Sequence, residues 1–155
     1  MTPEHGASPR LRIAIGIATV GRPEILIETV RDLCAQTRPA DRIIVCPARP
    51  EDAAGLAVAF AQVEQVASGR GLTRQRNAII RAAGDADVLV FFDDDFIARS
   101  DFLAGVEAVM ATQPEVVVAT GKVIADGILG PGFSVAQARE MVAADLALHP
   151  VAPER

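Results

Sequence analysis

The chain of 155 residues contains no tryptophan, no tyrosine and only six phenylalanines, although half of its residues are hydrophobic. Its core must therefore be built from isoleucine, valine, leucine and alanine. The 15 lysines and arginines face 20 aspartates and glutamates, which gives a net charge of −5. Because binding to nucleic acid needs a concentrated basic face, we expect no nucleic-acid partner.

Cysteine is also scarce, and so are long apolar stretches. Cys34 and Cys46 form neither a CxxC pair nor a histidine–cysteine cluster, which indicates free thiols in a reducing compartment. The start "MTPEHGASPR" has no apolar signal segment, and the longest apolar stretch, "AAGLAVAFAQV", is too short to span a bilayer. We expect a soluble, cytoplasmic protein and leave peripheral contact with a membrane open.

Short apolar runs alternate with segments of helical periodicity along the whole chain. Strands are expected at 11–18, 41–47, 64–68, 87–92 and 115–125, and helices at 24–36, 51–63, 71–84, 102–113 and 134–149. Strands that are apolar on both faces and alternate with helices predict an α/β fold. We expect a Rossmann-like open, mostly parallel sheet with helices on both faces. One domain over 11–148 would lie between a disordered tail, 1–10, and a frayed tail, 149–155.

Three turns of this fold are expected to lie at one edge of the sheet. "TVGRP" follows the first strand, "CPARPED" follows the second and "DDDF" follows the fourth. In open parallel sheets, ligands bind beyond the carboxyl ends of the strands. Gly21 in the first turn permits a close backbone approach, and the helix that follows favours an anionic or polar ligand at its start.

Three consecutive carboxylates, Asp93, Asp94 and Asp95, end the apolar run of the fourth strand. Residues two apart on an extended chain point to the same side, so Asp93 and Asp95 can converge. Two convergent carboxylates suit Mg²⁺ or Mn²⁺, which prefer oxygen ligands. The alternative is a solvated turn, where aspartate is common. Asp101 is expected to cap the next helix.

Arg76 falls on the apolar stripe of the third expected helix, together with Leu72, Ile79 and Ala83. A buried arginine requires an anionic partner, so a pyrophosphate or one of the three aspartates should lie near it. The alternatives are a side chain that reaches out to solvent and a plain ion pair.

These segments, in this order, resemble the family 2 glycosyltransferases with the GT-A fold. The resemblance is carried by "IGIATVGRPEILIETVRDLCAQ", "ADRIIVCPARPED", "GRGLTRQRNAIIRAAGDADVLVFFDDDF" and "SDFLAGVEAVM", and it covers about 12–110. It implies transfer of a sugar from a nucleotide-diphosphate sugar, with inversion by family habit. The implied cofactor is Mn²⁺ or Mg²⁺, and the acceptor would be a saccharide or a lipid-linked molecule.

The resemblance also implies roles for individual residues. Asp93 and Asp95 match the metal-binding DxD positions, and Asp94 is assigned to the ribose. Residues matching the donor-binding positions are Thr19 and Arg22 in the first turn and Arg76 on the third helix.

The sequence departs from the family in two places. Where the family carries a base-recognising aspartate after the second strand, this chain has "CPARPED", so Glu51 or Asp52 could serve only if the loop is displaced. We therefore expect loose base selectivity. After the DxD the family also continues for longer than this chain, so the GT-A domain is expected to be incomplete at its C-terminus.

The missing portion leaves the catalytic base unknown. Asp126, at the end of the fifth expected strand, is a weak candidate under the strand-end rule. A truncated, non-catalytic donor-binding or interaction module is an alternative. A haloacid-dehalogenase-like phosphatase is a weaker one, because Ile97 stands where that family has threonine or valine. An uncovered sheet edge predicts self-association or a partner chain.

Overall fold

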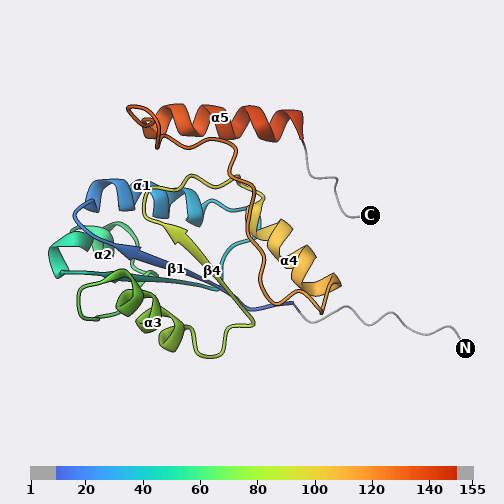
Figure 1. Cartoon of the computed structure of the whole chain (residues 1–155). Coiled ribbons are helices and arrows are strands. Elements are labelled where there is room, and N and C mark those ends of the chain that lie inside the picture. Colours follow the sequence, from blue (N-terminus) through green and yellow to red (C-terminus); the bar gives the residue numbers. More distant parts are fainter. Residues whose placement is uncertain (1–9, 150–155) are drawn as a thin grey trace, which may run out of the picture.

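A four-stranded parallel sheet forms the centre of the molecule in the computed structural model, which describes residues 10–149 (Figure 1). Its strands are β1 (Ile13–Thr19), β2 (Arg42–Pro47), β3 (Glu64–Gln65) and β4 (Val88–Asp93), in the order β3-β2-β1-β4. Each neighbouring pair is parallel, as the apolar runs predicted. The two expected tails lie almost entirely outside the described residues.

Helices cover both faces of this sheet. The long helices are α1 (Pro23–Cys34), α3 (Leu72–Ala83), α4 (Phe102–Thr112) and α5 (Val135–Leu148). α1 and α4 contribute to one buried cluster, and α3 contributes to another on the opposite face (Figure 1). The prediction of an open α/β fold with helices on both faces is therefore confirmed.

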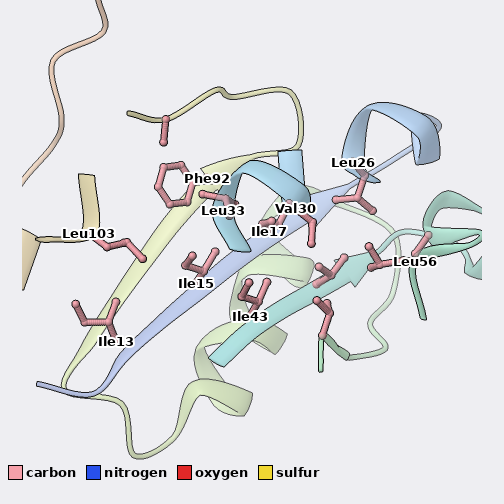
Figure 2. Close-up of a cluster of buried hydrophobic side chains, with 14 residues drawn as sticks. Ile13, Ile15, Ile17, Leu26, Val30, Leu33, Ile43, Leu56, Phe92 and Leu103 are labelled. Atoms are coloured by element: carbon pink, nitrogen blue, oxygen red, sulfur yellow. The ribbon is translucent and has the colours of Figure 1, made fainter. Parts of the chain in front are cut away.

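β1 alternates between the two clusters, as a buried central strand must. Ile13, Ile15 and Ile17 are fully buried on the α1 face, where they meet Leu26 and Val30 (Figure 2). On the opposite face β1 presents Ala14 and Gly16. A Cβ atom at Gly16 would lie 2.5 Å from Cγ2 of Ile79, so the glycine is what lets α3 lie directly against β1.

The second expected helix, 51–63, is divided in the structure. A 3₁₀ turn at Pro50–Ala53 and a single turn, α2 (Leu56–Ala59), flank Gly55, which has a φ of 78°. That left-handed conformation cannot continue a right-handed helix, and glycine adopts it at little steric cost.

The fifth expected strand, 115–125, is wrong. Within the described residues this segment pairs with no strand, and Val117 and Val118 are 87% and 85% exposed. β-branched residues favour an extended backbone, but a strand also needs a hydrogen-bonded neighbour. None of the described residues beyond Leu103 is buried.

α5 lies over α1 and is attached to it by charged side chains (Figure 1). Arg139 contacts Asp32 at 3.0 Å and Glu28 at 2.9 Å, both on α1. Arg99 contacts Asp145 of α5 at 2.9 Å. Of the helices in the described part of the chain, none is both long and apolar enough to cross a membrane.

Candidate functional site

The three turns expected at one edge of the sheet do meet there. In the parallel register, Thr19 at the end of β1 is the partner of Pro47 at the end of β2. Ala18 is the partner of Asp93 at the end of β4. The first turn, the loop after β2 and the three aspartates therefore share the carboxyl edge of the sheet, where ligands bind in folds of this type.

Asp94 is a buried residue at this edge and is held by several hydrogen bonds. It is only 3% exposed, and its Oδ2 accepts a 2.6 Å hydrogen bond from the Thr19 hydroxyl. Its Oδ1 accepts from Nη2 of Arg22, and its backbone carbonyl accepts a 2.8 Å bond from the Thr29 hydroxyl. Thr19 and Thr29 are themselves buried. The polar groups of Thr19 and Asp94, expected to approach the nucleotide, thus face each other here.

Arg22 joins the first turn to the acidic segment. Its guanidinium bridges two carboxylates, with Nη2 on Asp94 and Nη1 2.6 Å from Oδ2 of Asp95. Partial burial acts to lower the pKa of Arg22, but Asp94 and Asp95 outweigh it and raise this pKa above its ordinary value. Arg22 is therefore always positively charged. Its side chain is 45% exposed and contacts carboxylates that are more than 70 residues away in the sequence.

Asp93, at the end of β4, is 73% exposed. Its Oδ1 lies 3.6 Å from Nη2 of Arg76, and the guanidinium carbon of Arg76 lies 5.6 Å from the centre of the Phe91 ring. Arg76 therefore lies beside one of the three aspartates. These aspartates and a pyrophosphate are the two kinds of anionic partner that the sequence predicts for it.

The expected burial of Arg76, however, is wrong. Arg76 is 44% exposed and Leu72 is 53% exposed. The buried side of α3 is formed by Gln75, Ala78, Ile79 and Ala83. The helix is thus turned by about one residue from the expected stripe, because Gln75 and not Arg76 bonds the strand ends, and Leu72 is left in solvent.

Gln75 is a buried residue at the carboxyl edge that sequence reasoning missed. It is 4% exposed, and its Nε2 donates to the carbonyl of Thr19 at 2.9 Å and to that of Cys46 at 2.7 Å. It ties the start of α3 to the ends of β1 and β2 and so positions the next residue, Arg76. The available signal was its spacing of three and four residues from Ala78 and Ile79, which places it on their face.

The loop after β2 carries a buried carboxylate, Asp52. Its Oδ1 accepts a 2.9 Å bond from the Gly21 amide and its Oδ2 a 3.0 Å bond from the Arg49 amide. Gly21 has a φ of 72°, so the turn that carries Arg22 depends on a glycine and on this contact. Asp52 is committed to the backbone, whereas Glu51 is 67% exposed.

Two aspartates do not have the surroundings expected of them. Asp101 is the N-cap residue of α4, but its carboxylate makes no cap bond and lies 2.8 Å from Arg99. The hydrogen bond from Arg99 holds the pKa of Asp101 below its usual range, against the effect of burial. Asp126, the candidate base, does not end a strand, because the described residues 115–125 form none. It is exposed, and its Oδ1 accepts a 3.3 Å bond from the Ile128 amide.

The carboxyl edge has the donor chemistry that a hard divalent cation needs. The carboxylates of Asp93–Asp95 offer only oxygen atoms, which Mg²⁺ and Mn²⁺ prefer. Residues 10–149 hold no group of three or more histidine, cysteine, aspartate or glutamate side chains that could by itself bind a metal. Arg22 and Arg76 already pair with these carboxylates, so the acidic segment accepts cationic partners. Its residues therefore fit a divalent cation whose remaining coordination positions are filled by a bound ligand.

Comparison with known proteins shows the family. The model of the family described as glycosyl transferase family 2 matches residues 14–131, which is most of the chain and includes most of β1, all of β4 and the three aspartates. A search of curated proteins found no relative of this chain.

Proposed function

The chain belongs to glycosyl transferase family 2, and we propose that it binds a nucleotide-diphosphate sugar together with Mn²⁺ or Mg²⁺ at the carboxyl edge of its sheet. The proposed reaction is transfer of the sugar, with inversion, to a saccharide or lipid-linked acceptor. One observation carries the proposal: three carboxylates at the end of β4 lie against two guanidinium groups from β1–α1 and α3.

Each of these groups has a proposed task. Asp93 and Asp95, both accessible to solvent, would hold the cation, and Arg76 would contact the donor beside them. Asp94, held by Thr19 and Arg22, would keep the acidic segment in place and lie nearest the ribose. When bound, the cation stabilises the charge that develops on the leaving diphosphate as its bond to the sugar breaks.

A specific observation favours a second candidate, a donor-binding module without transferase activity. After α4 the described chain adds no strand, and the candidate base Asp126 is exposed and turned to its own loop. General-base activation of an acceptor typically contributes about 10²–10⁴-fold, so a site without a base transfers poorly. The phosphatase alternative is not retained, because the family match is to glycosyltransferases.

Two further expectations stay proposals. A cytoplasmic location, at most at the surface of a membrane, fits the composition. Self-association or a partner chain fits the exposed apolar residues beyond α4, such as Val117, Val118, Ile128 and Leu129. Sedimentation velocity tests this: a monomer at all concentrations contradicts self-association.

Calorimetry with uridine, guanosine and thymidine diphosphates, each with and without Mn²⁺, tests donor binding. We expect Mn²⁺ to bind weakly alone and at least about tenfold more tightly with a nucleotide, because the phosphates complete its coordination shell. Asp93→Asn and Asp95→Asn should lose this coupling, and Glu115→Gln, a control at an exposed carboxylate after α4, should keep it. Coupling that survives in both site variants contradicts the assignment. An exclusive preference for uridine diphosphate contradicts the expected loose base selectivity.

Turnover separates the two candidate functions. Release of nucleoside diphosphate from a panel of donors, measured with and without saccharide acceptors, should rise with acceptor if the chain is a transferase. A chain that binds donor with Mn²⁺ but releases diphosphate only slowly, and equally without acceptor, is the donor-binding module.

A further inference from the structure

Arg22 occupies an unusual position for a residue expected to contact the donor. Its guanidinium is engaged with Asp94 and with Asp95, which are more than 70 residues away in the sequence. Asp95 is also one of the two carboxylates assigned to the cation. Arg22 therefore places a positive charge on an oxygen that the divalent cation needs.

We propose that Arg22 is an exchangeable counter-ion, which neutralises Asp94 and Asp95 in the cation-free protein and leaves Asp95 when a divalent cation binds. This inference rests on the proposed function, because it assumes that Asp95 is a ligand of the cation. It assigns to Arg22 a role in coupling the cation to the donor.

The burial of the partners determines which of them can move. Arg22 is 45% exposed, so its side chain can turn into water without leaving an apolar pocket. Asp94 cannot follow it, because it is 3% exposed and held through its side chain by Thr19 and through its carbonyl by Thr29. A buried carboxylate without its cationic partner is costly, so Arg22 keeps its bond to Asp94. Asp95, which is 49% exposed, is the carboxylate that Arg22 can release to a divalent cation.

The charges explain why the cation and the donor bind together. Three carboxylates face two guanidinium groups, which leaves one net negative charge. A divalent cation would make this group net positive while both arginines remain. The two negative charges of a donor pyrophosphate would return the group to its starting charge. Arg22, once free of Asp95, lies beside the site with its charge available to those phosphates.

Arg76 provides an internal comparison. It also faces a carboxylate, but at 3.6 Å, from a single nitrogen, and with Asp93 largely in solvent. Such an exposed pair is screened by water and contributes little. Removal of Arg76 should therefore weaken donor binding without much change in the affinity for the cation alone.

Calorimetric titration of Mn²⁺, without nucleotide and with uridine diphosphate, tests the proposal on Arg22→Gln, Arg22→Lys and the wild type. Arg81→Gln, at an exposed position in the last turn of α3, is the matched control. We expect Arg22→Gln to bind Mn²⁺ alone at least about tenfold more tightly than the wild type and to gain less from the nucleotide. Arg81→Gln should behave as the wild type does.

Arg22→Lys decides the matter if Arg22→Gln does not fold, as judged by circular dichroism. A lysine is a point charge that cannot bridge two carboxylates as the planar guanidinium does, so it should be displaced more easily and bind Mn²⁺ a few-fold more tightly than the wild type. Unchanged or weaker Mn²⁺ affinity in the Arg22 variant that folds overturns the counter-ion proposal.

Failure of this inference differs from failure of the proposed function. If uridine diphosphate still enhances Mn²⁺ binding and Asp95→Asn abolishes that effect, while the Arg22 variants gain nothing, only the counter-ion is wrong. If Mn²⁺ binds to none of the proteins with or without the nucleotide, both proposals are overturned.

Discussion

Two clusters of arginine and aspartate lie at opposite edges of the same sheet, and they differ in burial. At the amino edge, Arg38 is 8% exposed and donates to Asp41, to Glu107 and to the carbonyls of Leu11 and Pro39. At the carboxyl edge, Arg22 is 45% exposed and bridges Asp94 and Asp95. Arginine thus pairs with carboxylates as a buried residue at the amino edge and as a half-exposed residue at the carboxyl edge.

This difference in burial indicates which ion pairs can exchange. All three nitrogens of the Arg38 guanidinium have acceptors, so its charge and its hydrogen bonds are satisfied within the protein. Arg22 uses only two of its nitrogens and faces water with the rest of its side chain. A buried, fully bonded pair resists replacement, whereas a half-exposed pair beside a ligand edge can give way to another cation.

The largest expected effect comes from removing Arg38. Arg38→Gln should lower the free energy of unfolding by about 3–5 kcal/mol, because it leaves Asp41 and Glu107 without their shared buried partner. Arg22→Gln should cost less, about 1–3 kcal/mol, the cost of an under-satisfied buried group at Asp94. Urea unfolding with and without Mn²⁺ measures both.

Mn²⁺ should distinguish the two variants. It should restore stability to Arg22→Gln, because a ligand that binds only the folded state raises its stability. It should not restore Arg38→Gln. If Mn²⁺ restores the stability of both variants equally, or if both lose equal stability and Mn²⁺ restores neither, the two edges do not differ in this way.

Gln75 tests whether the carboxyl edge also depends on neutral hydrogen bonds. Gln75→Leu should lower the free energy of unfolding by about 1–2 kcal/mol, since it leaves the Cys46 carbonyl without the amide while the Thr19 carbonyl keeps its bond from Ala48. Nucleotide affinity should fall as well, because Arg76 loses its anchored neighbour. Thr73→Leu, an exposed change on α3, is the control for added apolar surface. If the variant loses stability but keeps its nucleotide affinity, Gln75 supports only the fold and has no role in nucleotide binding.

The sequence predicts β1, β2 and β4 well because their apolar runs are long enough to identify buried parallel strands, whereas β3 is only the two residues Glu64–Gln65. It also places Asp93–Asp95 correctly at the carboxyl edge of the sheet, since that placement depends only on strand direction. It fails on the buried side of α3, where Arg76 and Gln75 differ by about 100° on the helix and only packing against β1 decides between them.

Other failures arise where a residue has a choice of partners. The run 115–125 has the composition of a strand, but composition cannot supply the neighbour that a strand requires. Asp101 can cap α4 or pair with Arg99, and in the structure it forms the charge-assisted pair with Arg99. The contact of Thr29 with the Asp94 carbonyl joins residues 65 apart, and no local pattern predicts it.

Acid should weaken the amino edge through Asp41. Burial acts to raise the pKa of Asp41, but hydrogen bonds from the Ile13 amide and Arg38 outweigh it and hold this pKa below its ordinary value. Asp41 therefore contributes stability that is complete above the unfolded-state pKa of about 3.9 and is lost as the pH falls through the lower folded pKa. Asp41→Asn should reduce the free energy of unfolding at pH 7, and the difference from the wild type should shrink towards pH 3. A difference that stays constant with pH contradicts this role.

The ion pairs between α1 and α5 involve neither a buried arginine nor a buried carboxylate, and the smallest effect is expected there. Arg139 is 39% exposed and contacts Asp32 and Glu28, while α5 has no buried residue. Because exposed pairs are weak and screened by salt, Arg139→Gln should speed hydrogen exchange in α5 by roughly two- to fivefold and leave exchange in β1 unchanged. The wild type should show the same increase at high salt. Arg31→Gln, which removes a pair within α1, should leave α5 as it is. If β1 exchanges faster in Arg139→Gln, α5 supports the sheet itself, and the order of strength drawn from burial does not hold.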